Sequence, residues 1–305
     1  MILGGLSGLA TTIALQPFDL LKTRIQQREP GDIVRARNTR SIIGTAKDIL
    51  ATKGVRGLWR GTNAGLIRNV PGIALYMTSL NHIRSLLATS PYFSVIRTPS
   101  SYTSTHASVL PSLTVTGNLL AGATTRVAIG FLLNPVSVLK TRYESNMYSY
   151  ASLSSAFLSM VRSGPSELLR GFVASSLRDA PYAGIFVVSY EAIKQNATVL
   201  LPPNSTMSSA LLHSLSAASA GTVATLTTHP FDVIKTKVQV RTEDRYHGLA
   251  RTVKTIFQQR GLLGFFDGAS LRLSRKVLSS AIGWAVYESV LLFMKRQPEL
   301  KSERT

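Results

Sequence analysis

Residues 16–27 read QPFDLLKTRIQQ, and two later stretches repeat their pattern: residues 134–142 read NPVSVLKTR and residues 229–237 read HPFDVIKTK. Each copy follows an apolar segment and precedes a basic, polar segment. An internal repeat of this kind determines the architecture before any single residue is interpreted. The 305-residue chain is therefore expected to contain three similar repeats, at residues 1–96, 112–198 and 207–296.

The composition is unusual for a soluble protein, because the chain is 45% hydrophobic and only 16% charged but carries a formal net charge of +19. This excess of cations favours a polyanionic partner or a membrane that contains anionic lipid. A nucleic-acid-binding protein is disfavoured, because the cations follow the ends of apolar runs and form no single basic stripe with aromatic residues between them. The absence of cysteine excludes disulfides, Cys-ligated zinc and thiol catalysis.

Six apolar stretches have the length of membrane-spanning helices, since about 20 helical residues cross a hydrocarbon core of about 30 Å. The stretches are residues 2–15, 64–87, 113–133, 172–193, 210–228 and 269–294. Several contain charged residues, which in a membrane protein should face the bundle interior or an aqueous cavity. We therefore expect an all-α membrane protein with six transmembrane helices. The alternative is a soluble all-α protein in which the same segments are core helices.

Between the two apolar stretches of each repeat lies a shorter segment with helical periodicity, at residues 41–52, 150–161 and 249–257. Each suits a short amphipathic helix in the membrane interface. These basic linkers all lie on one side of six spans, and the positive-inside rule places that side inward and both termini outward. No cleavable signal precedes the apolar run at Ile2, so the chain is expected to start inside its first helix, which is either truncated or short.

A glycine-rich turn follows each short helix, and its backbone amides and basic residues could hold a lipid phosphate. The residues expected to bind lipid are Gly54, Trp59, Arg60, Gly61, Gly164, Arg170, Gly171, Gly261 and Gly268.

The repeated motif itself suggests a gate. Proline removes a backbone donor and kinks a helix, so three kinked helices can converge at one end of a cavity. Asp19 and Lys22 are three residues apart and share a helix face, as do Asp232 and Lys235, so each helix presents an anion and a cation to its neighbours. Ion pairs between these helices would form a plug that opens when the pairs exchange.

The threefold Pro-x-Asp/Glu-x-x-Lys/Arg-x-Lys/Arg signature, the glycine turns and the period of roughly 100 residues resemble the mitochondrial carrier family over essentially the whole chain. The resemblance implies six helices in a pseudo-threefold barrel in the inner mitochondrial membrane. The three short amphipathic helices would lie on the matrix side, and the carrier would alternate between two open states. It also implies an anionic lipid such as cardiolipin as a partner, a monomeric state, and no cofactor, metal or nucleic acid.

In such a carrier the motif residues form the matrix gate. They are Pro17, Asp19, Lys22, Pro135, Ser137, Lys140, Pro230, Asp232 and Lys235. The second copy lacks the acid, because Ser137 takes its place. If the lysine of each repeat pairs with the acid of the next repeat, Lys140 pairs with Asp232, Lys235 pairs with Asp19, and Lys22 loses its partner.

The resemblance also implies an outer gate on the even-numbered helices, built on an aromatic-acid-x-x-base motif. Its residues are Asn81, Arg84, Tyr190, Glu191, Lys194, Tyr287 and Glu288. In cyclic order Arg84 could pair with Glu191, and Lys194 could pair with Glu288. This network is incomplete as well.

A binding ring is expected midway along the even-numbered helices, where arginine is followed by a polar residue in each repeat. The candidate substrate contacts are Arg68, Asn69, Arg178, Asp179, Arg275 and Lys276, with Arg126 as a further candidate where the other repeats have glycine. Arginine can hold a carboxylate through two donors, and Asp179 can take an ammonium group. Little apolar material lies beside them to select a long side chain, which favours a small zwitterion.

Residues 135–145 and 177–184 resemble the carriers that import glycine for the first step of haem synthesis. Arg126 also fits that subgroup. The leading hypothesis is therefore a glycine transporter that uses alternating access. The alternatives are a carrier for another small amino acid or metabolite, and a non-transporting adaptor with a carrier fold. An enzyme is disfavoured, since the five histidines show no metal-ligand spacing and no catalytic triad or nucleotide loop is evident.

Overall fold

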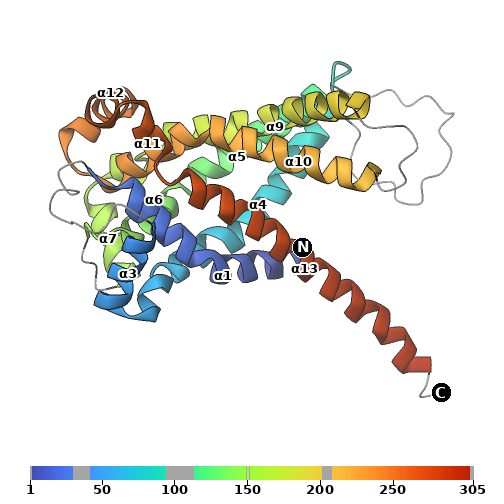
Figure 1. The fold of residues 1–305 in the computed structure, drawn as a ribbon, viewed down its shortest axis with the longest axis horizontal. Coiled ribbons are helices and arrows are strands. Elements are labelled where there is room, and N and C mark those ends of the chain that lie inside the picture. The colour runs from blue at the N-terminus through green and yellow to red at the C-terminus, as the bar shows by residue number, and fades with distance from the viewer. Residues whose placement is uncertain are drawn as a thin grey trace. The chain divides into compact units, whose positions relative to one another are not determined.

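A computed structural model describes residues 2–29, 42–93, 113–148, 150, 152–200 and 208–302, and the regular elements there are all helices (Figure 1). The chain divides into two compact units. The first unit comprises Met1–Ala74, Leu133–Phe172 and His229–Thr305, and the second comprises Leu75–Leu132 and Val173–Thr228. The first unit therefore contains all three copies of the motif.

The motif proline affects the helix differently in the three repeats. Helix α1 (Ile2–Gln26) continues through Pro17. In the second repeat the helix is broken before the motif, into α5 (Val115–Leu132) and α6 (Asn134–Glu144). The third repeat is broken in the same way, into α10 (Ser208–Thr227) and α11 (His229–Val240).

Trp59 provides a physical reason for the continuity of α1. Pro17 has no N–H, so the carbonyl of Ile13, four residues earlier, lacks its intrahelical donor. The indole Nε1 of Trp59 donates to this carbonyl at 2.9 Å. The matching turn positions hold Leu169 and Phe266, whose side chains have no N–H to donate.

The three short helices predicted from periodicity are confirmed, and each is followed by a short helical turn and a long even-numbered helix. The short helices are α3 (Ile42–Lys53), α7 (Leu153–Arg162) and α12 (Leu249–Arg260). The turns contain η1 (Val55–Trp59), α8 (Pro165–Leu168) and η3 (Leu262–Phe266), and η2 (Asp244–Tyr246) precedes α12. The long helices are α4 (Thr62–Ala88), α9 (Phe172–Leu200) and α13 (Ala269–Ser302).

Helix α7 shows why these short helices form. Ser152 caps its N-terminus by accepting from the backbone N–H of Ser155, which satisfies one of the free amide donors of the first turn. Ala156 and Met160, four residues apart, are buried on one face and pack against Val138 of α6. Burial of an apolar side chain as large as that of Met160 contributes about 1.5–3 kcal/mol.

In the first unit the three motif helices α1, α6 and α11 contact one another in pairs, as the repeat predicts. Helix α1 also packs along α13 (Figure 1). Gly8 permits the close approach of α1 to α4, because a Cβ at this position would lie 2.7 Å from the Cδ1 of Ile73. The absence of a side chain at Gly8 therefore allows the two helices to pack closely in the first repeat. The equivalent positions are Arg126 in the second repeat and Gly221 in the third, where a Cβ would lie 3.8 Å from Cε2 of Phe186, an ordinary contact distance.

Among the described residues, no single helix meets the length and hydropathy criteria for a membrane span, whereas α5 and α6 meet them together as a bent pair.

Candidate functional site

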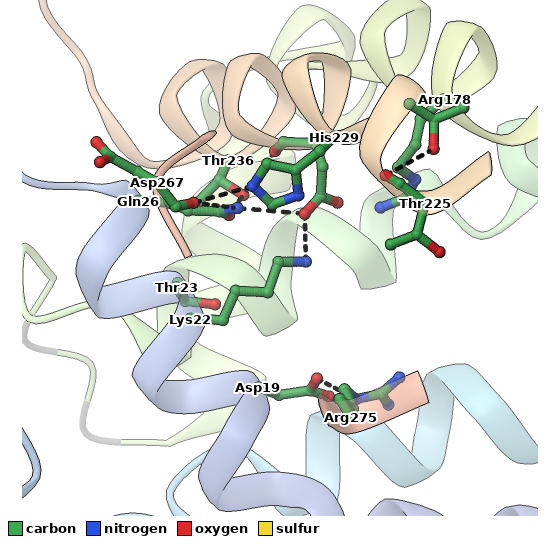
Figure 2. Close-up of polar contacts among 12 residues, drawn as sticks. Asp19, Lys22, Thr23, Gln26, Arg178, Thr225, His229, Thr236, Asp267 and Arg275 are labelled. Carbon is green, nitrogen blue, oxygen red and sulfur yellow. Dashed lines mark hydrogen bonds and ion pairs between the residues drawn. The ribbon is translucent and has the colours of Figure 1, made fainter. Parts of the chain in front are cut away.

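Two interhelix ion pairs join the motif residues in the first unit. Lys22 pairs with Asp232, and the Nζ of Lys140 lies 2.6 Å from Oδ2 of Asp19. In Figure 2 a dashed line marks the contact of Lys22. The lysine of each of these two repeats thus pairs with the acid of the preceding repeat. The predicted pairs Lys140–Asp232 and Lys235–Asp19 are therefore wrong, as is the predicted loss of a partner for Lys22. The direction of pairing depends on how the three helices are arranged around their common contact, which the linear motif does not encode.

The observed direction of pairing also changes which lysine is affected by the missing acid of the second repeat. In the same cyclic order, an acid at position 137 would be the partner of Lys235 and not of Lys22. Ser137 and Lys235 are both buried.

Arg275, predicted to contact substrate, makes an ion pair with the other oxygen of the Asp19 carboxylate, Oδ1 (Figure 2). Asp19 is thus shared by Lys140 of α6 and Arg275 of α13. Because attraction between charges grows where water is scarce, two cations hold this largely but not fully buried carboxylate firmly. The structure therefore links a predicted substrate residue directly to the predicted gate.

A second polar layer, which the sequence reasoning missed, lies next to the ion pairs. The threonine after each motif lysine donates to the residue nine positions after the proline of the next repeat. The bonds are Thr23 to Glu144 (2.9 Å), Thr141 to Gln239 (2.9 Å) and Thr236 to Gln26 (2.7 Å). The signal was present in the sequence, since threonine recurs at one position and Gln, Glu and Gln recur at the other.

The second base of each motif donates to a backbone carbonyl near the helix end of the next repeat. The bonds are Arg24 Nε to Glu144 O (2.8 Å), Arg142 Nε to Gln239 O (3.0 Å) and Lys237 Nζ to Arg28 O (2.8 Å). The last carbonyls of a helix have no intrahelical donor, so a cation stabilises them by a hydrogen bond and by the helix dipole. These bases therefore hold neighbouring repeats together.

The residue before each motif proline contacts the turn that precedes the long even-numbered helix of its own repeat. The sequence reasoning also missed this contact. Gln16 Nε2 donates to Arg60 O at 2.9 Å, and Asn134 Nδ2 donates to Leu168 O at 2.7 Å. His229 Nε2 lies 3.1 Å from Asp267 O, which requires the proton on Nε2 (Figure 2). Each motif is thus fixed to the start of the following long helix.

In the second unit, the predicted binding residues Arg178 and Asp179 pair with each other. Arg178 Nε lies 2.7 Å from Asp179 Oδ1, and Nη2 lies 2.8 Å from Oδ2. The Arg178 side chain is 15% exposed and that of Asp179 is 32% exposed, so this bidentate pair is accessible on its acid side. A base and an acid are therefore held together at the position where a zwitterion was expected.

The remaining predicted substrate residues have varied surroundings. Asn69 donates to Thr12 Oγ1 at 2.8 Å in the first unit, and Arg68 is half-buried there. Arg126 is exposed in the second unit, with its guanidinium 5.2 Å from the ring centre of Tyr76, a distance that allows a cation–π interaction. Lys276 is exposed.

The predicted outer gate is described only in part. In the second unit Arg84 is half-buried and Glu191 is exposed, and the described side chains include no ion pair between them. Tyr190 stacks on Phe186 with a centroid distance of 6.3 Å. Asn81 and Glu288 are exposed. The side chains of Lys194 and Tyr287 lie outside the described part of the chain, so the expected Lys194–Glu288 pair does too.

The predicted lipid-binding turns make several protein contacts. Gly61 has φ of 93°, and a Cβ there would lie 2.9 Å from Cγ of Glu144, so only glycine suits this turn. Gly171 has φ of 73° and equally close contact with Gln239. Arg170 donates to Arg241 O at 2.6 Å. These contacts give the turns a role in packing, and their binding of lipid stays a prediction.

Metal binding has no support in the described residues, which contain no group of three or more His, Asp or Glu side chains able to hold an ion.

Comparison with known proteins agrees with this geometry. A family model described as "Mitochondrial carrier protein" matches residues 1–91, 111–199 and 207–298. A protein of Laccaria bicolor named "Mitochondrial glycine transporter" is 63% identical over 97% of this chain and 97% of its own length. Proteins with the same name from Aspergillus fumigatus and Mycosarcoma maydis are 42% and 38% identical, over 94% and 93% of this chain and 90% and 82% of their own lengths.

Proposed function

Because this chain belongs to the mitochondrial carrier family, we propose that it transports glycine across the mitochondrial inner membrane. The glycine transporters to which it is similar support this substrate. Transport proceeds by alternating access and involves no covalent chemistry, so the residues act by binding and by opening or closing a path. The interhelix pairs Lys22–Asp232 and Lys140–Asp19 form the closed inner gate.

The observation that carries this proposal is the bidentate pair between Arg178 and Asp179. Glycine has a carboxylate and an ammonium group separated by a single methylene. The carboxylate replaces Asp179 on the guanidinium of Arg178, and the ammonium group takes Asp179. Glycine thus replaces the ion pair between Arg178 and Asp179 with two ion pairs of its own, so that the charges of both side chains stay paired. A molecule with only one of the two charges leaves its counterpart unpaired, which is costly where water is scarce.

The test is uptake of glycine by purified protein in liposomes. Arg178→Gln and Asp179→Asn each leave a polar side chain and remove one charge, and each is expected to lower uptake at least about tenfold, which corresponds to 1.4 kcal/mol. The matched control is Arg251→Gln, which removes an exposed cation from α12. Unchanged uptake in both site variants would show that the site lies elsewhere.

Competition identifies the substrate. Unlabelled glycine is expected to inhibit uptake more strongly than larger amino acids, acetate or methylamine. If the wild type takes up another small amino acid and not glycine, the protein is a carrier for that compound. If no small metabolite is taken up or raises the melting temperature, it is a carrier-fold adaptor.

The finer features of this proposal follow from the family and the charge pattern. The basic linkers face the matrix and both termini face the intermembrane space. Anionic lipid such as cardiolipin binds the glycine turns, and the carrier works as a monomer. The glycine supplies the first step of haem synthesis.

A further inference from the structure

Lys140 contacts two carboxylates, although the sequence motif offers it only one. Its Nζ lies 2.6 Å from Asp19 of α1 and 3.4 Å from Glu144, which follows it by four residues on α6. The motif signature contains no acid at this position, and Glu144 was absent from the predicted gate. Glu144 is 3% exposed, so a full negative charge is buried beside the ion pair.

The other two repeats act as an internal comparison. At the position of Glu144 they hold Gln26 and Gln239, which accept the same threonine hydrogen bond that Glu144 accepts from Thr23. Glu144 also accepts from Gln16 Nε2 at 3.0 Å. A neutral amide oxygen could accept both of these bonds. The hydrogen bonds therefore do not require a charge at Glu144, whereas the nearby ammonium group of Lys140 benefits from one.

The two carboxylates differ in what happens to them when the helices separate. Asp19, Gln16 and Thr23 all belong to α1 and leave together if α1 moves away from α6. Glu144 stays one helical turn from Lys140, because residues four apart on a helix are neighbours. Separation thus removes the closer partner of Lys140 and two donors of Glu144, and leaves the lysine and the glutamate facing each other.

We propose that Glu144 is a second acceptor for Lys140, which holds the lysine when the Lys140–Asp19 pair breaks and so eases opening of the inner gate. Glu144 is a positioning residue that acts through Lys140 and does not touch substrate. Its negative charge also brings the acids of the gate to three, matching the three motif lysines despite Ser137. The inference rests on the proposed transport function, and one arm of its test is independent of that function.

Glu144→Gln tests the proposal, since it introduces the residue type that the other repeats carry. Without a second acceptor, Lys140 leaves Asp19 less readily. The initial rate at saturating glycine is expected to fall about fivefold, within the range of a modest coupling between two states, with little change in the concentration for half-maximal uptake. Glu144→Asp, which keeps the charge, is expected to restore at least part of the rate. The matched control is Asp48→Asn, which neutralises an exposed acid of α3 outside the gate.

The arm that needs no substrate uses the absence of cysteine. Leu20→Cys places the only thiol of the chain at a fully buried position of α1, so its rate of reaction with a maleimide reports opening. In this background Glu144→Gln is expected to slow labelling. A contact that only stabilised the closed state would give faster labelling on its removal, and that result, or an unchanged rate, overturns the proposal. Failure of the wild type to take up glycine would contradict the proposed function and leave this arm intact.

Discussion

Glu167 shows how a single residue holds the parts of one repeat together on the linker side. Its carboxylate pairs with Arg142, the second base of the motif, and with Arg170 of its own turn at 2.7 Å. Burial raises the pKa of Glu167, but the hydrogen bond and charge of Arg142, together with those of Arg170, outweigh burial and leave the pKa below the ordinary 4.5. The ionised form therefore stabilises the fold.

The pH dependence of stability follows from this direction. The stabilisation by Glu167 is fully present above pH 4.5, which is the pKa of this carboxyl group in the unfolded chain. It is lost as the pH falls through the lower pKa that the group has in the folded protein. At neutral pH, Glu167→Gln is expected to lower the free energy of unfolding by about 1.5–3 kcal/mol, the range for a hydrogen bond to a charged group. Melting curves of the wild type and of Glu167→Gln, recorded between pH 7 and pH 3, would show a difference in melting temperature that becomes smaller on acidification. A difference in melting temperature that becomes larger on acidification would contradict a lowered pKa of Glu167 in the folded protein.

At the scale of elements, the turn that contains Trp59 keeps helix α1 continuous through Pro17. The indole donates to Ile13 O, and Gln16 donates back to Arg60 O, so the helix and the turn are bonded in both directions. In the other repeats the turn side chain has no such donor, and the helix is broken before the motif. The interaction is thus specific to the first repeat.

Trp59→Phe tests this interaction. Phenylalanine keeps one six-membered aromatic ring, but the carbonyl of Ile13 loses its donor. We expect a loss of about 1 kcal/mol in the free energy of unfolding, measured by thermal or denaturant melting in detergent. Phe266→Leu at the matching position of the third repeat is the control, because it removes aromatic carbon and no donor. Equal melting of Trp59→Phe and the wild type would show that the bond contributes nothing to stability.

The elements were more predictable from the sequence than their contacts. The period and the apolar faces predicted α3, α7 and α12, because helical periodicity is a local property of the chain. The charge of Asp19 and Lys140 predicted interhelix pairs. The partner of each residue depends on the order in which the helices are arranged, which the motif does not encode. The predicted direction, in which each lysine pairs with the acid of the next repeat, was therefore wrong. Glu144 was missed because its significance appears only when Thr23 and Gln16 of another repeat lie against it.

At the scale of the whole molecule, the proposed function assigns the described residues to one state of a transport cycle. The inner pairs Lys22–Asp232 and Lys140–Asp19 are formed, while Arg84 and Glu191 do not pair among the described side chains. Alternating access requires the opposite state, in which the inner pairs break and outer pairs form. A ligand or a mutation shifts such an equilibrium only by its different effect on the two states.

Neutralising one residue of each gate should therefore shift the protein in opposite directions. Lys140→Gln removes a cation that holds the inner gate closed, so labelling of the Leu20→Cys reporter is expected to become faster. Glu191→Gln removes the partner that Arg84 gains only in the opposite state, so labelling is expected to become slower. Each shift is expected to reach about tenfold, since loss of one charged hydrogen bond corresponds to about 1.5–3 kcal/mol and 1.4 kcal/mol is a factor of ten. Arg251→Gln should leave labelling unaltered. If both gate variants change labelling in the same direction, the two sets of residues are not opposing gates of one carrier.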